Sequence, residues 1–270
     1  MNALYNHIKY AIENSNAGKI LVHSDLLRGF KLQLAPDEGL LDAHCKLLIG
    51  FGKDIYMPTF NYDFPKTRIF DVANTPSKVG VINEYFRKSY AQWQTPVPIF
   101  SVSGIGFFPE IRYQNEIDPF DENSIFGFLH KTNSLILYYG AAFSSTTLIH
   151  YVERISKLLY YRYDKFFEGE VVSNGISKRV ILKLHVRPMG RILEYDWVRL
   201  ENDLNKNNLI QYFSDQATKI KIIRIDELVE FWMERIKRDP LYFLNNESKI
   251  WIKPLLNKLG RPFLITDFEK

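Results

Sequence analysis

SLILYYGAAFSSTTLIHYVE, residues 134–153, is the stretch that decides the fold of this chain. Its run Ser134–Tyr139 predicts a buried strand, because apolar runs of this length occur where a strand is covered on both faces. The small and hydroxyl residues that follow predict a loop, and the segment that carries His150 and Glu153 predicts a helix. A buried strand that leads through a loop into a helix is the repeating unit of α/β folds.

The segments upstream of this stretch repeat the alternation of strand and helix signals. The expected elements are helices over 2–14 and 38–50 and strands over 19–23, 54–57 and 99–105. The assignment rests on helical spacing of apolar residues in the first group and on short apolar runs in the second. We therefore expect a layered α/β/α fold around a central sheet that is largely parallel or mixed.

Two features between residues 61 and 86 complete the N-terminal half. Asn61–Asn74 is polar and aromatic without periodicity, which predicts a long loop of the kind that is often functional. Thr75-Pro76 predicts the start of a helix, because threonine is a frequent helix cap and proline suits the first helical position. Val79, Ile82 and Phe86 then have helical spacing.

The pattern changes beyond residue 160. Val171–Val172 and Arg179–Val186 flank Ser173-Asn174-Gly175, which predicts a β-hairpin. Helices are expected over 196–213 and 226–238, around a strand over 219–225. Since no linker rich in Pro, Gly or Ser separates the halves, we expect one domain, 1–270, in which 168–270 forms an elaborated C-terminal part.

Composition and charge exclude several classes of protein. The chain is 46% hydrophobic with 20 Phe and 16 Tyr, ample for a core, and its one cysteine, Cys45, has the helical apolar spacing of a buried core thiol. No signal peptide and no apolar stretch of about 20 residues is visible, which predicts a soluble, cytoplasmic protein without a membrane partner. The net charge of +4 favours small anionic partners, but the basic residues are scattered, so no nucleic-acid partner is expected.

His150 and Glu153 are the residues most suited to chemistry. Three positions apart, they share one helix face, so that the carboxylate can orient an imidazole whose pKa suits proton removal near neutral pH. The same residues also fit an ordinary capped helix, and the pattern alone does not choose between the two. His23, with Ser24 and Asp25, ends a strand, where ligands bind in α/β sheets. No metal-binding spacing and no nucleotide-binding or serine-hydrolase motif is present.

Several short motifs resemble the aminoglycoside 3-N-acetyltransferase family in order and spacing. The best match is Thr147-Leu-Ile-His150-Tyr-Val-Glu153, which is similar to that family's Thr-x-x-His-x-x-Glu signature. The remaining similar segments are Val22-His23-Ser24, Met57-Pro58-Thr59, Thr75-Pro76-Ser77-Lys78-Val79-Gly80, Pro98-Ile99-Phe100-Ser101-Val102, Asn123-Ser124-Ile125-Phe126-Gly127 and Tyr161-Arg162-Tyr163. The resemblance covers about residues 19–167 well and the remainder weakly.

The resemblance implies a transfer of an acetyl or other short acyl group from acyl-coenzyme A to a sugar amine in a ternary complex. It implies catalytic roles for His150 as base, Glu153 as its partner and Thr147 at the thioester. The residues that it places along coenzyme A are His23, Ser24, Thr75, Ser77, Lys78 and Gly80. The residues that we expect around the acceptor are Asp25, Thr59, Asn61, Tyr62, Ser144 and Ser145, and no metal is implied.

The departures from the family pattern concern the pocket and not the signature. Gln94-Thr95-Pro96-Val97-Pro98 stands where the family has Arg-Ser-x-His-Pro, so two polar, ionisable positions are lost. Ser144 occupies a position often held by Asp, and Asp25 replaces the second Ser of the early motif. We interpret these differences as a changed acceptor or acyl pocket.

The acceptor is the least determined feature. A basic chain without the Asp at position 144 suits a nucleotide-linked amino sugar, as in surface-polysaccharide synthesis, better than a polycationic aminoglycoside. Aminoglycoside acetylation, as in antibiotic resistance, is the alternative, and Asp118–Glu122 is an acidic segment that could line its amine site. A non-catalytic protein that binds coenzyme A or a nucleotide sugar is the alternative from another class. The oligomeric state is left open.

Overall fold

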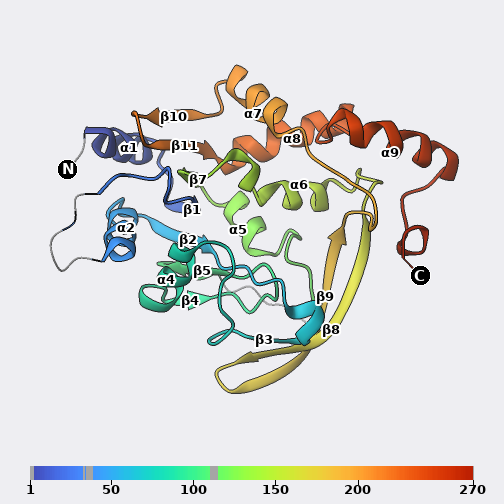
Figure 1. The fold of residues 1–270 in the computed structure, drawn as a ribbon, viewed down its shortest axis with the longest axis horizontal. Helices are drawn as coiled ribbons and strands as arrows, with labels where there is room; N and C mark the ends of the chain where they lie inside the picture. Colours follow the sequence, from blue (N-terminus) through green and yellow to red (C-terminus); the bar gives the residue numbers. More distant parts are fainter. Residues whose placement is uncertain (1–2, 33, 35–38, 110–114, 270) are drawn as a thin grey trace.

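A seven-stranded mixed sheet forms the centre of the molecule (Figure 1). The computed structural model describes residues 3–32, 34, 39–109 and 115–269. The strand order is β10-β11-β7-β1-β2-β5-β4, in which β7, β1 and β2 are parallel and the other pairs are antiparallel. The strands are β1 (Lys19–Ser24), β2 (Asp54–Pro58), β4 (Trp93–Gln94), β5 (Val102–Ile105), β7 (Ser134–Tyr139), β10 (Gln211–Ser214) and β11 (Lys219–Arg224).

The predicted strand of the opening stretch, β7, separates two hydrophobic cores. All six of its residues are buried. Leu135, Leu137 and Tyr139 belong to one core, and Ile136 and Tyr138 to the other, as the period of two along a strand requires. Each such large apolar side chain contributes about 1.5–3 kcal/mol by leaving water.

Helices cover both faces of the sheet, which confirms the layered α/β/α arrangement (Figure 1). One core is shared with α1 (Ala3–Asn14), α2 (Leu40–Ile49) and α4 (Val81–Ser89). The other is shared with α5 (Ile125–Lys131), α6 (Leu148–Ser156), α7 (Trp197–Lys206), α8 (Ile225–Arg238) and α9 (Asn246–Leu259). In the part of the chain that the structure describes, no helix is long and apolar enough to cross a membrane.

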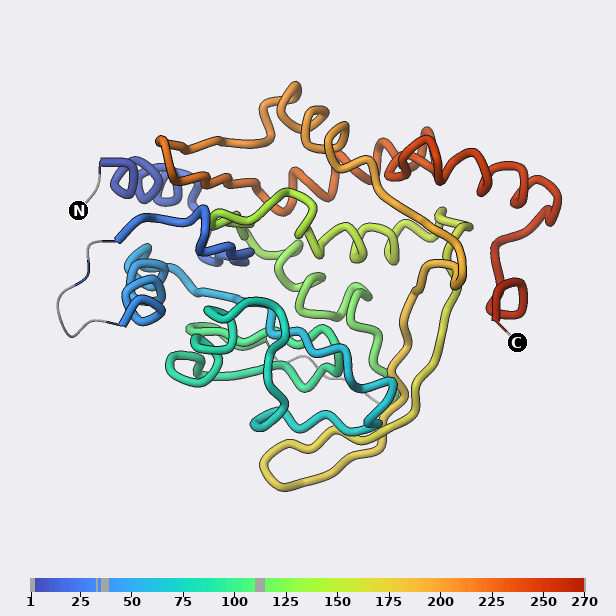
Figure 2. Tube along the Cα trace, viewed as in Figure 1, coloured from blue at the N-terminus to red at the C-terminus, as the bar shows by residue number. Residues whose placement is uncertain are grey.

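The hairpin predicted around Asn174-Gly175 is present and is longer than the sequence indicated. Strands β8 (Tyr163–Ser173) and β9 (Ile176–Val186) run along one side of the molecule (Figure 2). Asn174 and Gly175 have φ angles of 50° and 76°, the left-handed pair that a two-residue hairpin turn needs. Together with β3 (Ile69–Asp71) and β6 (Glu116–Ile117), the hairpin forms a second sheet of four strands in the order β3-β8-β9-β6.

The expected loop Asn61–Asn74 and the expected helix start at Thr75 were both wrong. The loop contains α3 (Phe64–Thr67) and β3, because β3 pairs with the distant strand β8. The helix α4 begins only at Val81. Thr75 instead closes a turn: its Oγ1 accepts the backbone N–H of Asp71 at 2.9 Å, and its own N–H donates to the Asp71 carbonyl.

Two further boundaries differ from the expectation. The strand expected from Ile99 begins at Val102, because Ile99 has a φ of 67°, outside the range of an extended strand. The helix expected over 196–213 ends at Lys206, and the last residues of that range form β10 against β11. The segment that forms α9 was assigned no element by the sequence. In the second of these cases the strand pairing of β10 with β11 overrides the helical spacing of the segment.

Gly140, which ends β7, lies where no side chain fits. Its φ is 75°, and a Cβ there would lie 2.2 Å from the carbonyl oxygen of Asp25. Gly140→Ala is therefore expected to lower the free energy of unfolding by about 2–5 kcal/mol, through a left-handed backbone and a steric clash. Gly175→Ala is the matched control, since its φ is 76° but no atom lies within 4 Å of the added Cβ. In Gly175→Ala the free energy of unfolding is expected to fall by about 1–2 kcal/mol. Equal losses in urea unfolding would contradict the assigned clash.

Candidate active site

A pocket of about 440 Å³ lies beyond the carboxyl ends of β1 and β2, where parallel strands of an α/β sheet place ligands. Eight of the residues singled out from the sequence line it: His23, Ser24, Tyr62, Gly80, Ser144, Ser145, Thr147 and His150. The other residues of its wall are Pro58, Phe60, Val79, Asn83, Phe100, Thr146, Ile149 and Trp197. Segments far apart in the sequence therefore meet at one site.

The first turn of α6 carries His150, and Glu153 follows one turn later on the same face. His150 Nδ1 lies 2.8 Å from Glu153 Oε2. The side chain of His150 is 32% exposed, whereas that of Glu153 is 1% exposed. The imidazole thus reaches the pocket, and the carboxylate lies behind it. Since Nδ1 is engaged by a carboxylate, Nε2 is the nitrogen left for a substrate.

Glu153 is held ionised although it is buried. Burial alone would raise its pKa, but the charge of Arg162 and hydrogen bonds from His150 and Tyr195 outweigh burial and lower the pKa to about 2. Arg162 Nε lies 3.0 Å from Glu153 Oε1, an ion pair without the alignment of a hydrogen bond. The hydroxyl groups of Tyr195 and Tyr161 donate to the same oxygen at 2.7 and 3.3 Å.

His23 gives the pocket wall a neutral imidazole. It is 5% exposed, and burial lowers its pKa to about 4. Its ring stacks on Tyr138 at 5.7 Å, and its Nε2 has no hydrogen-bond partner among the described residues. A buried polar atom without a partner is uncommon in proteins. The Nε2 of His23 is therefore an unsatisfied polar atom in a residue that lines the pocket.

Asn83 joins the ends of two strands that border the pocket. Its Nδ2 donates to the carbonyl of Pro58 at 2.6 Å, and its Oδ1 accepts the hydroxyl of Ser24 at 2.7 Å. The end of β1, the end of β2 and α4 are thereby joined. Asn83 was not among the predicted site residues, since an Asn within a helical pattern carries no signal of such a contact.

Three of the residues expected around the acceptor lie outside the pocket. Thr59 is 1% exposed and its Oγ1 donates to the Ser101 carbonyl at 3.2 Å. Asn61 is buried and its amide donates to the Pro76 carbonyl at 2.8 Å. Asp25 Oδ1 accepts the N–H of Leu27 at 3.0 Å in a turn. Their polar groups bind their own chain and stabilise the loops around the site.

The segment Thr75–Gly80, which we call the connector, leads into α4, and only part of it lines the pocket. Of its expected residues, Gly80 lines the pocket, whereas Thr75, Ser77 and Lys78 do not. Ser77 donates its N–H to the Glu84 carboxylate at 2.7 Å. Lys78 Nζ lies 2.6 Å from Asp63 on the surface, so its charge is engaged there. These three residues therefore hold the connector in place.

The acidic segment Asp118–Glu122 does not bring a carboxylate to the pocket wall. Asp118 is buried and pairs with Arg154 Nε at 2.6 Å, and Asp121 Oδ1 caps a turn by accepting the N–H of Asn123. Phe120 does reach the site, where its ring lies 5.5 Å from that of His150. The segment thus contributes an aromatic contact in place of the expected charge.

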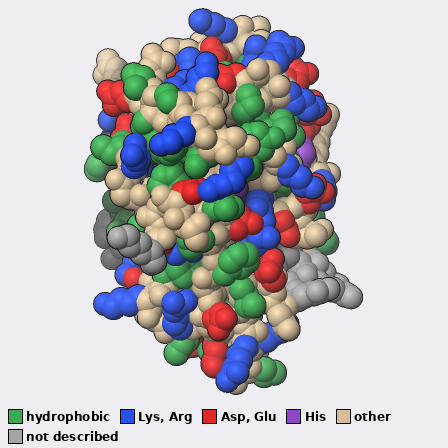
Figure 3. All heavy atoms as spheres, turned by 90° about the vertical axis from the view of Figure 1, so that its right-hand side faces the viewer, with side chains coloured by type: hydrophobic (Ala, Val, Ile, Leu, Met, Phe, Trp, Pro, Cys, Tyr) green, Lys and Arg blue, Asp and Glu red, His purple; other side chains and the backbone are tan. Residues whose placement is uncertain are grey.

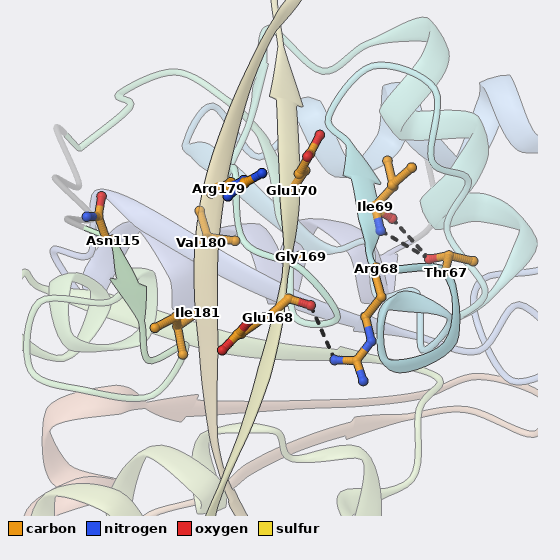
Figure 4. Close-up of a pocket in the computed structure, with 10 residues that line it drawn as sticks. All are labelled: Thr67, Arg68, Ile69, Asn115, Glu168, Gly169, Glu170, Arg179, Val180 and Ile181. Carbon is orange, nitrogen blue, oxygen red and sulfur yellow. Dashed lines mark hydrogen bonds between the residues drawn. The ribbon is translucent and has the colours of Figure 1, made fainter.

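A second hollow, of about 600 Å³, lies on the hairpin sheet and is separate from the site (Figure 4). It is lined by Thr67, Arg68, Ile69, Asn115, Glu168, Gly169, Glu170, Arg179, Val180 and Ile181. None of the residues expected to be catalytic or to bind substrate is among them. In the described part of the chain, no cluster of three or more His, Cys, Asp or Glu side chains is arranged to hold a metal ion.

The fold is shared with solved acetyltransferase structures. Apo aminoglycoside acetyltransferase AAC(3)-IVa is 18% identical over 89% of this chain and 91% of its own, with a TM-score of 0.67. AAC-IIIb in its binary complex with CoASH is 16% identical over 87% of this chain and 96% of its own, with a TM-score of 0.69. The YokD protein of Bacillus subtilis is 18% identical over 91% of this chain and 94% of its own, with a TM-score of 0.64.

A family model gives the more specific result. A comparison with curated proteins finds no match. The model described as aminoglycoside 3-N-acetyltransferase matches residues 55–237, which include most of β2, the signature on α6 and most of the C-terminal part. This match spans more than half of the sequence. The chain therefore belongs to the aminoglycoside 3-N-acetyltransferase family and is an N-acyltransferase.

Proposed function

We propose that the protein transfers the acetyl group of acetyl-coenzyme A to an amine of an aminoglycoside-type amino sugar, with His150 as the general base. The observation that carries this proposal is the His150–Glu153 pair, 2.8 Å apart, at the wall of a pocket beyond the strand ends. Family membership supplies the reaction class and the donor.

The pair suits direct transfer. Glu153 accepts a hydrogen bond from Nδ1–H of His150, so the neutral imidazole presents a lone pair on Nε2. Nε2 removes a proton from the acceptor ammonium group, and the freed amine nitrogen attacks the thioester carbonyl carbon. As the new C–N bond forms and the C–S bond breaks, the thiolate of coenzyme A leaves and takes up the proton that His150 holds. The nitrogen of the new amide releases its remaining extra proton to solvent, so charge and protons balance and no covalent enzyme intermediate forms.

The remaining pocket residues suit a thioester. His23 and the Ser144–Thr147 loop line the same pocket as His150. The loop ends at α6, whose nine residues place the positive end of a helix dipole there. Tyr138 holds this loop, since its hydroxyl lies 2.6 Å from Thr146 Oγ1. We assign to this wall the thioester and its developing oxyanion.

We infer the class of acceptor from proteins of the same fold. Solved relatives of the same fold include AAC(3)-IVa in complex with a gentamicin and with apramycin, and AAC-VIa bound to sisomicin. These proteins are 16–18% identical to this chain. They favour the aminoglycoside alternative over the nucleotide-linked sugar that the net charge suggested.

One observation favours a less cationic acceptor as a second candidate. None of the described residues that line the pocket is an Asp or a Glu, whereas a polycation is best bound by carboxylates. Charges of both signs are mixed on the face in Figure 3, so net charge does not mark a cationic or anionic side there. The same described lining includes no Lys or Arg, so it favours an amino sugar of low charge at this wall, and the nucleotide-linked amino sugar is kept as the second candidate.

Purified protein with acetyl-coenzyme A and two acceptor panels separates the candidates. We expect thiol release with aminoglycosides. Release only with nucleotide-linked amino sugars would replace the first candidate by the second. No release with either panel, under conditions in which a known family member is active, would contradict the proposed function.

A further inference from the structure

The C-terminal part supplies a residue that contacts the His150–Glu153 pair. Tyr195 lies in a segment that pairs with the start of α9: Tyr195 and Leu244 form a β-bridge, and Asn245 donates its N–H to the Glu194 carbonyl at 3.0 Å. Next to it, Asp196 donates its N–H to the Phe243 carbonyl at 2.9 Å. These backbone bonds fix the position from which the Tyr195 side chain reaches α6.

The Tyr195 hydroxyl lies between a buried cation and a buried anion. It donates to Glu153 Oε1 at 2.7 Å and accepts a hydrogen bond from the guanidinium of Arg162. The Arg162 guanidinium also lies 5.9 Å from the Tyr195 ring, and that ring lies 6.2 Å from the imidazole of His150. Arg162 is anchored in turn, since Nη1 donates to the carbonyl of His185 at 2.9 Å.

We propose that Tyr195 and Arg162 are positioning residues for catalysis: they hold Glu153 Oε1 so that Oε2 stays directed at Nδ1 of His150. This inference rests on the proposed function, in which His150 is the base. A carboxylate bonded through one oxygen alone can rotate, and the bond to the imidazole then weakens. With Oε1 bound to Arg162 and Tyr195, the remaining oxygen accepts a hydrogen bond from Nδ1–H, and Nε2 remains the basic nitrogen.

A purely structural role for Tyr195 predicts a different outcome. If its hydroxyl served only to pack the C-terminal part against α6, its removal would lower stability and leave the rate of the folded enzyme unchanged. A positioning role predicts a lower kcat with little change in KM for either substrate. It also predicts a change at the Nδ1 proton of His150, which is visible by NMR as a low-field imidazole resonance.

The chain offers a matched pair of conservative variants. Tyr195→Phe and Tyr161→Phe each remove one hydroxyl that donates to Glu153 Oε1, at 2.7 and 3.3 Å respectively. Only Tyr195 also accepts from Arg162. We expect kcat to fall roughly tenfold or more in Tyr195→Phe, the loss typical of a lost hydrogen bond to a charged group, and clearly less in Tyr161→Phe. The Nδ1 resonance should broaden or shift in Tyr195→Phe and persist in Tyr161→Phe.

Equal kcat losses in the two variants, or a wild-type kcat and an unchanged resonance in Tyr195→Phe, would overturn the inference. The resonance can be recorded on the protein without substrates. A wild-type protein that acetylates nothing but shows the variant-dependent resonance would therefore contradict the proposed function and leave the positioning role standing. Circular dichroism of each variant separates a changed site from a changed fold.

Discussion

Replacing His150 by alanine is expected to lower kcat by about 10²–10⁴-fold, the range typical of a lost general base. No other side chain in the described pocket wall combines an exposed imidazole nitrogen with a carboxylate partner. His23, the other imidazole of the wall, is kept neutral by a pKa of about 4 and lacks such a partner. The residual rate should reflect substrate positioning alone.

The loss in His150→Ala should concern catalysis and not folding. The His150 side chain is about one-third exposed, so its removal leaves no large cavity. His130→Ala is a suitable control: this histidine on α5 contacts the Tyr151 hydroxyl through Nδ1 at 2.9 Å and does not line the pocket. Steady-state kinetics on both variants, at matched folded concentration, is the measurement. Near wild-type kcat in His150→Ala would remove His150 from its assigned role.

Replacing Glu153 by alanine should cause the largest loss of stability. The variant leaves the guanidinium of Arg162, which is 6% exposed, without its buried counter-charge. Breaking such a pair costs about 3–5 kcal/mol. For a chain of this size we expect the melting temperature to fall by ~10 °C. The double variant Glu153→Ala/Arg162→Met removes both charges and should recover much of the loss. A double variant no more stable than Glu153→Ala would contradict the assigned electrostatic cause.

The pH dependence of this contribution has a definite sign. The pKa of Glu153 is lowered from its ordinary value of 4.5 to about 2, so the folded state favours the ionised form. Its contribution to stability is complete above pH 4.5 and is lost as the pH falls toward 2. The difference in melting temperature between wild type and Glu153→Gln should therefore shrink below pH 4.5. A difference that stays constant across this range would show that Glu153 is not held ionised in the fold.

Strands and turns were predicted correctly where neighbouring residues alone determine them. The run Ser134–Tyr139 is buried at every position, and Asn174-Gly175 forms the turn that its residues require. The pattern failed where pairing is distant. Strand β3 forms against β8, far along the chain, and a local pattern does not reveal such a partner. Strand β10 pairs with the nearby β11, and there the helical spacing of the segment was misleading.

Some residues of the candidate site were predictable from local spacing, and others were not. His150 and Glu153 were found because their spacing of three places both on one helix face. Arg162 was noted only as part of a motif, and Tyr195 and Trp197 were missed, since they reach the site from the C-terminal part through contacts that no spacing reveals. Thr75 and Lys78 do not line the pocket, because their side chains contact Asp71 and Asp63, and their predicted role along coenzyme A stays a prediction.

The most direct test of the central claim is a single-turnover experiment with labelled acetyl-coenzyme A, analysed by mass spectrometry of both the enzyme and an amino-sugar acceptor. The account predicts that the acetyl group leaves coenzyme A only when the acceptor is present and appears on one of its amines. In His150→Ala the same product should form at least about a hundredfold more slowly. An acetylated enzyme that forms without acceptor, or an acceptor acetylated at wild-type rate by His150→Ala, would contradict direct transfer with His150 as base.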